Sequence, residues 1–530
     1  MEARLPARSS PGSSRVRCAP NRAPELPKPE APLPLIAPIS EASADIAALA
    51  KGGRTNVFGF FLRLAARLPF LFIAGRLYGK ENLGRFAAAV VAVEIAAQLA
   101  TFGQKRGLAQ LLQRDDRPAN CIVVDGLFVS LGVSALLAVI LYAFPMVLYP
   151  TGGWTMAERL LPLVIFPIAA GDIALAALAF RFDIATTVRA RSLVEPWVLS
   201  LAAGALWFVL PDTGMIVAYF LSMVAAMAVA LYALLRSYGV PHGWSPHPLI
   251  LGRQAWANLP IAGADLIETA TRKIDILLLA YLTSPAIVGV YWAAQQIASL
   301  PQKLKTSFEP ILGPVITSSV KDKDYAAIAR QVCQVGFWVT AAQLGVALAL
   351  GIPGEGVMGL VGRDFVGGTG ALGLLLAAEV IAATAVVSEA ALIYLAPLRN
   401  LAISVFTIVL QAGFTVLLID AADLWDMPPL WKAAAAAAGL FLALAFSSLA
   451  KALILTSILE RPINNWRWAL LWATAAALIV GAIAVRLPEW AELLFGIPAI
   501  LAAYGAVIWS KGFGHEDRAL FRRSKPSASS

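Results

Sequence analysis

Charged residues stand inside several long apolar stretches of this 530-residue chain, and they are the residues that could do chemistry. Arg63 and Arg67 lie four residues apart, which places both on one face of a helix. A charge near the centre of a bilayer costs roughly 2.5–3.5 kcal/mol on insertion scales, so such residues usually serve a function. Arginine suits phosphate because its planar fork can donate hydrogen bonds to two oxygens. The first stretch therefore predicts an anion-binding site within the membrane.

A second charged group lies in the segment 254–282, which we predict to be one helix. Its members are spaced i, i+3, i+7 and i+10, which places them on one helical face: Asp265, Glu268, Arg272 and Asp275, with Lys273 beside them. The acids could balance the cations or bind a coupling ion such as sodium or a proton. A purely structural ladder of ion pairs along one helix would use the same spacing.

The charged residues fall into two candidate sets. The candidate cargo-binding cations are Arg67, Arg272, Arg63 and Lys273, and the candidate coupling or charge-balancing acids are Glu94, Asp265, Glu268 and Asp275. Arg63 could instead reach the membrane surface with its long side chain. Arg67 and Arg272 are less easily explained this way, because two facing cations repel unless an anion or carboxylates lie between them.

The elements that must hold these residues are membrane-spanning helices. The chain is 59% hydrophobic and 14% charged, with a mean hydropathy of +0.73, and one soluble core could not bury that much apolar surface. A bilayer core of about 30 Å needs roughly 20 apolar residues per helix. The predicted spans are 56–77, 85–103, 121–148, 157–180, 192–210, 214–235, 254–282, 286–305, 332–352, 369–395, 397–419, 431–458, 466–486 and 491–510. The fold class is an all-α polytopic membrane protein with about 14 transmembrane helices.

The distribution of positive charge predicts the orientation. With both termini in the cytoplasm, inside segments collect about 28 lysines and arginines against about 7 in outside loops. Residues 1–54 are rich in Pro, Ser, Ala and Arg and lack an apolar core, so we expect a disordered basic cytoplasmic tail rather than a signal peptide. We expect a second basic tail at 511–530.

An internal repeat organises the spans. A shift of about 205 residues aligns Leu77, Gly84, Phe86, Ala88 and Ala89 with Leu282, Gly289, Tyr291, Ala293 and Ala294, and aligns Arg67 with Arg272. Six spans separate the copies, so we predict two parallel six-helix lobes related by an axis along the membrane normal. The N-lobe would be 55–240 and the C-lobe 250–460, followed by two further spans at 461–510. Charges at the same depth in both lobes predict a polar cavity between them.

Several classes of function lack their signatures in the sequence. The histidines lie in predicted loops or the tail, and the three cysteines match no metal-ligand spacing, so we expect no metal or cofactor. No phosphate-binding loop of the G-x-x-x-x-G-K-[ST] type is present, and no long outside loop that could form a catalytic domain. The basic residues gather in alternate loops, which favours membrane topology over nucleic acid as the reason for the net charge of +9.

Several short segments resemble one family. They are Leu277 to Tyr281, the run from Val288 to Ile297 with Pro301, the Arg-rich first span followed by Gly79, Gly84 and Phe86, the segment RARSLVEP at 189–196, and FEPILGP at 308–314. These resemble bacterial polysaccharide flippases, the Wzx-type and exopolysaccharide exporters of the MATE-like MOP superfamily. The resemblance implies two six-helix lobes around a V-shaped cavity and alternating access. It also implies a lipid-linked, undecaprenyl-pyrophosphate oligosaccharide as cargo, moved across the bacterial inner membrane for polysaccharide or lipopolysaccharide biosynthesis. By position, the pyrophosphate-contacting cations would be Arg67 and Arg272, and more weakly Arg63 and Lys273.

Two other functions stay open. A cation-coupled multidrug exporter would use the same fold, although cationic cargo favours lone acids over an arginine pair. An integral membrane enzyme such as an O-antigen ligase would need a large outside loop with catalytic residues. The expected partners of a flippase are the lipid-linked oligosaccharide, membrane lipids, a coupling sodium or proton, and polysaccharide polymerase machinery.

Overall fold

The computed structural model describes residues 68–114, 117–241, 244–305 and 325–513, and every regular element in these residues is a helix. The main helices are α2 (Gly79–Ala100), α3 (Gln104–Arg114), α4 (Ala119–Ala143), α6 (Ile165–Phe180), α8 (Glu195–Trp207), α9 (Gly214–Tyr238), α10 (Pro248–Thr271), α11 (Ile274–Leu282), α12 (Pro285–Lys305), α14 (Tyr325–Gly351), α16 (Thr369–Leu395), α17 (Pro397–Leu424), α18 (Trp431–Leu459), α19 (Trp468–Ala484) and α21 (Ile497–Val507). Short elements join them, among them η1 (Ala74–Tyr78), α5 (Met156–Arg159), α7 (Ile184–Val188), η4 (Arg189–Val194) and α15 (Gly354–Val361). The predicted all-α fold class is confirmed.

The predicted spans from the second to the fourteenth each coincide with helical segments of the structure. Within the described residues, nine helices are long and apolar enough to cross a membrane. The other predicted spans are occupied by helices that are shorter or more polar, such as α8 and the pair α10 and α11. The first predicted span lies mostly outside the described residues, and so do Arg63 and Arg67.

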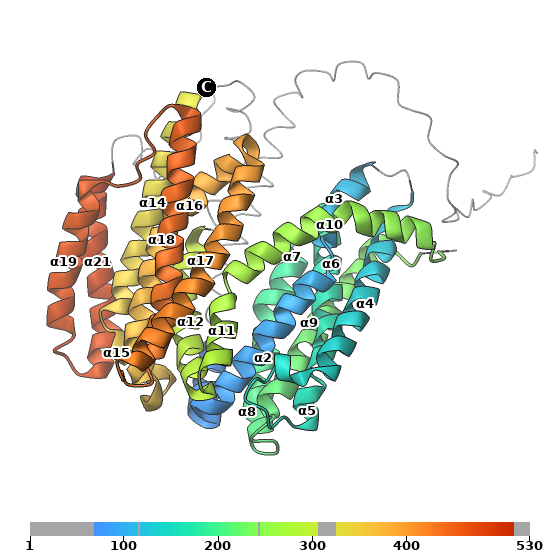
Figure 1. The fold of residues 1–530 in the computed structure, drawn as a ribbon, viewed down its shortest axis with the longest axis horizontal. Helices are drawn as coiled ribbons and strands as arrows, with labels where there is room; N and C mark the ends of the chain where they lie inside the picture. Colours follow the sequence, from blue (N-terminus) through green and yellow to red (C-terminus); the bar gives the residue numbers. More distant parts are fainter. Residues whose placement is uncertain (1–67, 115–116, 242–243, 306–324, 514–530) are drawn as a thin grey trace, which may run out of the picture.

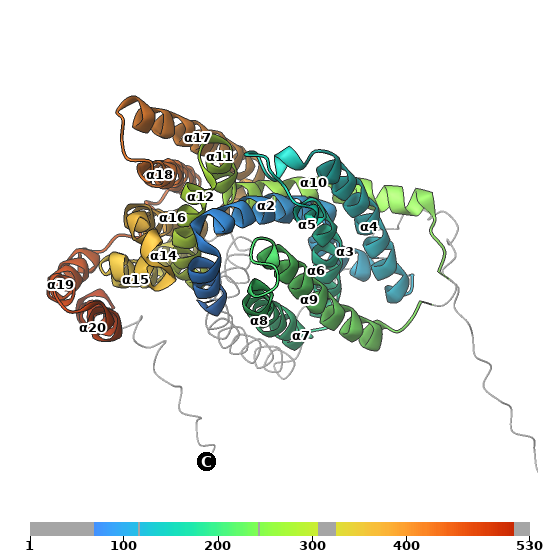
Figure 2. The same ribbon diagram turned by 90° about the horizontal axis from the view of Figure 1, so that it is seen from below.

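The predicted outside turn between the first two spans is a single glycine. The chain is helical from Leu68 through η1, and Gly79, the first residue of α2, then takes a φ of +78°. This left-handed conformation is open to glycine because it has no Cβ. The chain changes direction there without a loop, which Figure 2 shows as the bend in the first coloured segment.

Two helical bundles lie side by side in Figure 1. The helices from α2 to α9 form one bundle, and those from α12 to α18 form the other, with α19 and α21 beyond it. We call the end of the molecule that holds the connections after α4, α8, α11 and α17 the outer end, because the charge bias predicts that it lies outside the cell. At the lower centre of Figure 1, which is this outer end, α2, α11 and α12 bring the bundles together.

Helix α10 connects the bundles at the opposite end. It packs against α2, α3 and α4 of the first bundle and also against α17 of the second. In Figure 1 it runs obliquely across the top of the first bundle, whereas α11 descends steeply from it. The chain thus changes direction between α10 and α11, at the residues that the sequence marks as candidate cations.

Small residues allow the central helices to pack closely. The middle of α2 is almost wholly alanine and valine, and residues 86–93 are buried. In lipid, small side chains let helix backbones approach and gain van der Waals contact. Large apolar side chains instead face outward on many helices, for example Leu136, Leu201, Leu398 and Trp468, which are 61%, 68%, 80% and 75% exposed. This apolar exterior is what a lipid-facing surface requires.

Candidate functional site

The predicted helix 254–282 is broken at its two cations, which corrects the expectation of one continuous face. Helix α10 ends at Thr271 and α11 begins at Ile274, with Arg272 and Lys273 between them. The hydroxyls of Thr269 and Thr271 each donate to the carbonyl four residues earlier, at 2.9 and 2.8 Å. Such back-bonding bends helices. As a result, Asp265 and Asp275 face different neighbours.

Arg272 is exposed at this break, and no described residue forms an ion pair with it. It lies ten residues before the end of α11. At 1.5 Å per residue this corresponds to about 15 Å, or half of a bilayer core of about 30 Å. The break is therefore near the predicted mid-depth of the membrane. Discontinuous helices at this depth line the binding sites of many transporters.

Lys273 reaches from the break to the other bundle. Its ammonium forms an ion pair with the Glu94 carboxylate on α2. The Tyr219 hydroxyl on α9 donates to the other oxygen of Glu94 at 3.1 Å. The side chains of Lys273 and Glu94 are 26% and 35% exposed, so water or a ligand can reach the pair. Among the sequence-predicted residues, Lys273 and Glu94 are thus brought together.

Arg106 on α3 binds two of the candidate acids. Its guanidinium lies 3.1 Å from Asp265 and 2.8 Å from Glu268, both on α10. Asp265 is 3% exposed, whereas Arg106 and Glu268 are more than half exposed. The buried carboxylate therefore depends on Arg106 for its counter-charge. Sequence reasoning did not single out Arg106, because the contact between α3 and α10 is set by tertiary structure.

Asp275 has a different environment, although it was grouped with the same acids. Its side chain is fully buried on α11. It accepts hydrogen bonds from the Tyr291 hydroxyl, from the Gln295 amide at 3.1 Å and from the backbone N–H of Ile276 at 2.9 Å. Within the described residues it has no ion-pair partner. A carboxyl group in this setting is held by hydrogen bonds alone, and Tyr291 and Gln295 both come from α12.

A further ionic cluster, only partly buried, lies in the first bundle, and sequence reasoning did not identify it. Arg191 of η4 pairs with Asp172 of α6 and, at 2.8 Å, with Glu195 of α8. Lys105 of α3 also reaches Asp172, at 3.2 Å. The i,i+4 spacing of Arg191 and Glu195 was a local signal for one of these pairs. The cluster balances its own charges and ties four helical segments together.

Comparison with known proteins identifies the fold. No protein-family model and no curated protein matches the sequence. Among solved structures, the inward-facing conformation of a multidrug resistance MATE family transporter of the MOP superfamily aligns with 76% of this chain and 99% of its own. The identity is 15% and the TM-score 0.61. The lipid II flippase MurJ in an inward closed conformation aligns with 89% of this chain and 100% of its own, at 11% identity and a TM-score of 0.64.

These likenesses establish the architecture. An outward-facing MATE family transporter aligns less well, with a TM-score of 0.54 over 77% of this chain and 96% of its own, at 16% identity. Sequence identities this low show a shared fold. The chain is a multi-pass membrane protein with the fold of MOP-superfamily transporters, so the predicted MATE-like architecture is confirmed. The polysaccharide cargo stays a prediction.

Proposed function

We propose that this protein is a flippase that moves a lipid-linked oligosaccharide across the bacterial inner membrane for polysaccharide or lipopolysaccharide biosynthesis. The cargo would carry a pyrophosphate on an undecaprenyl chain. The single observation that carries the proposal is the interrupted helix at Arg272 and Lys273, which brings two cations to the predicted middle of the membrane. The fold shared with the lipid II flippase MurJ supports it.

The chemistry of the break suits a phosphoryl group. Arg272 offers a planar fork that no described acid occupies. The N-terminus of α11 follows directly, and helix N-termini favour anions. Lys273 is held by Glu94, which would balance its charge while no cargo is bound. Arg67, the predicted symmetry mate of Arg272, would supply a further cation from the first span.

Moving the sugar would then depend on the two lobes. Each sugar hydroxyl that crosses an apolar core unaided loses its hydrogen bonds to water. A hydrated path between rocking lobes removes most of that cost, while the prenyl tail stays in lipid. The higher TM-score with an inward-facing than with an outward-facing MATE structure supports cargo loading from the cytoplasmic side in this state.

The energy source would be an ion gradient, and Asp275 is the best-placed acid to carry the ion. Arg106 binds Asp265 and Glu268, and Lys273 binds Glu94. Asp275 is buried among hydrogen-bond donors without a cation from the described residues. Taking up a proton there would neutralise a charge that is otherwise costly to bury.

The proposal is tested with purified protein in lipid vesicles. A fluorescent undecaprenyl-pyrophosphate-linked disaccharide is incorporated, and a membrane-impermeant reductant then reports the fraction that has crossed. We expect Arg272→Ala to reduce flipping at least about tenfold, and Arg272→Lys to restore it only in part, because lysine keeps the charge but loses the fork. Arg67→Ala should behave like Arg272→Ala.

The matched control is Arg253→Ala, which removes another exposed arginine, on α10 and away from the break. It should flip the lipid at the original rate. Normal flipping by the Arg67→Ala/Arg272→Ala double variant would exclude anion capture. If the unaltered protein leaves the lipid unflipped but accumulates ethidium under a sodium or proton gradient, the protein is instead a cation-coupled multidrug exporter.

A further inference from the structure

The two repeat copies meet at their equivalent glycines. Helices α2 and α12 cross at Gly84 and Gly289, where a Cβ on Gly84 would overlap the carbonyl oxygen of Pro285 and lie 2.8 Å from the Gly289 nitrogen. A Cβ on Gly289 would in turn overlap the carbonyl oxygen of Lys80 and lie 3.0 Å from the Gly84 nitrogen. Each glycine thus faces the residue four positions before the other. Such reciprocity is the mark of a two-fold contact.

The crossing leaves no space for a side chain, and its neighbours are buried. Val288 and Val290, on either side of Gly289, are 1% and 0% exposed, and Leu83 beside Gly84 is 0% exposed. The obstructing atoms are backbone carbonyls, which cannot rotate away as a side-chain end could. A methyl group at either glycine would therefore force the two helices apart.

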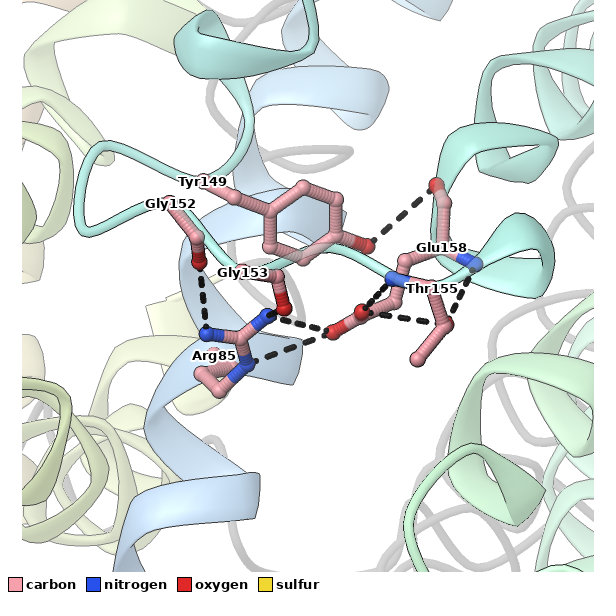
Figure 3. Close-up of polar contacts among 6 residues, drawn as sticks. All are labelled: Arg85, Tyr149, Gly152, Gly153, Thr155 and Glu158. Carbon is pink, nitrogen blue, oxygen red and sulfur yellow. Dashed lines mark hydrogen bonds and ion pairs between the residues drawn. The ribbon is translucent and has the colours of Figure 1, made fainter.

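The loop at residues 148–155, between η2 (Pro145–Val147) and α5, is held beside this crossing. Arg85, next to Gly84, donates to the carbonyls of Gly152 and Gly153 at 3.0 and 2.9 Å (Figure 3). It also binds the Glu158 carboxylate at 3.0 Å. Gly152 and Gly153 both have positive φ, at +74° and +67°, which allows the turn that presents their carbonyls to Arg85. Thr155 and Glu158 close a capping box at the start of α5.

Helix α11 and the start of α12 touch the same loop. The Tyr281 hydroxyl on α11 donates to the carbonyl of Val147 at 3.2 Å. Ala280 and Pro285 line a small pocket together with loop residues 148–151. The loop therefore lies over the line along which the two bundles meet, and Arg85 ties it to α2.

We propose that Gly84 and Gly289 are positioning residues that allow the outer end to close. This rests on the proposed transport by alternating lobes. In the closed state the backbones meet at the two glycines, and the loop held by Arg85 covers the contact. Opening to the outside separates α2 from α12 and breaks the Tyr281 bond, while the Arg85 bonds within the first bundle persist. Adding one methyl group favours the open state, because only the closed state is obstructed.

The test measures accessibility from each side of the membrane. A single reporter cysteine, Ala280→Cys, is placed in a protein in which Cys18, Cys121 and Cys333 are serine. A membrane-impermeant maleimide is then applied to one face at a time in sealed vesicles of defined orientation. We expect Gly84→Ala and Gly289→Ala each to raise the labelling rate from the outer face roughly tenfold or more.

The matched control is Gly373→Ala on α16, where an added Cβ meets no atom within 4 Å. It should leave the labelling rate unchanged. Equal labelling in all three variants, with thermal unfolding unchanged, would overturn the proposal.

If the alanine variants fail to fold, cross-linking Thr151→Cys to Pro285→Cys with a short bifunctional reagent replaces them. The cross-link should stop outer-face labelling reversibly, and labelling that continues would also overturn it. Because labelling needs no cargo, a wrong choice of cargo leaves these results unaffected.

Discussion

The two copies of the repeat place different chemistry at equivalent positions. In the first copy Phe70 and Phe86 pack ring against ring, with their centroids 5.7 Å apart. A shift of about 205 residues replaces them with Asp275 and Tyr291, which are joined by a hydrogen bond. Both positions of each pair are buried. The fold thus accepts an apolar pair here, so stability alone does not explain the buried carboxyl group of the second copy.

The ion pair between the bundles likewise has no counterpart at the positions related to it by the repeat. Lys273 of the second copy binds Glu94 of the first. The positions related to them by the repeat are Leu68 and Ser299, which carry no charge. The backbone crossing at Gly84 and Gly289 is symmetric, whereas the charged and hydrogen-bonded groups are not. We therefore expect the symmetric crossing to serve the proposed movement of the lobes and the asymmetric groups to serve the proposed binding and coupling.

The largest expected effect is on stability, in the aromatic pair of the first copy. Phe86→Ala removes a side chain that is 3% exposed and contacts the rings of Phe70, Tyr219 and Trp292. We expect the free energy of unfolding to fall by about 3 kcal/mol. Thermal unfolding of the purified protein in detergent measures it. Phe86→Leu should change neither the stability nor the flipping rate appreciably. A loss of flipping without a loss of stability in that variant would show that the apolar pair of the first copy also takes part in transport.

The next effect is on coupling, in the polar pair of the second copy. Asp275→Asn keeps the size of the side chain but removes its charge and its ability to take up a proton. We expect flipping to fall about tenfold and to lose its dependence on the ion gradient, with little change in thermal unfolding. The measurement is the vesicle assay with and without an imposed proton or sodium gradient. Unchanged gradient dependence would reduce Asp275 to a packing group, equivalent to Phe70.

The sequence predicted the spans and the repeat, because apolar length and residue identity are local properties. Gly84 and Gly289 were aligned from sequence alone, and the structure places them in contact. The break at Arg272 and Lys273 was missed, because apolar residues continue on both sides of it and the back-bonding of Thr269 and Thr271 is a weak local signal.

The ion-pair partners of the charged residues could not be predicted from the sequence, for a different reason. Arg106 lies more than 150 positions from Asp265 and Glu268, and Lys273 is similarly distant from Glu94. Only the packing of α3 and α2 against the broken helix decides these pairs. Asp265 and Asp275, which the helical spacing grouped together, therefore belong to separate environments.

The smallest expected effect concerns the ion pair that crosses between the bundles. Lys273→Gln, Glu94→Gln and the double variant form a double-mutant cycle. Because the two side chains are 26% and 35% exposed, solvent screens their attraction, and we expect a coupling free energy of only about 1 kcal/mol in thermal unfolding.

The single variants should nevertheless differ in their binding of a pyrophosphate. Glu94→Gln frees Lys273 for cargo and should raise the affinity for farnesyl pyrophosphate in detergent, whereas Lys273→Gln should lower it. In the Lys273→Gln background, Glu94→Gln should then have no effect on that affinity. If Glu94→Gln raised the affinity equally in the original protein and in the Lys273→Gln background, Glu94 would repel the anion directly. Lys273 would then not exchange the Glu94 carboxylate for the pyrophosphate of the cargo.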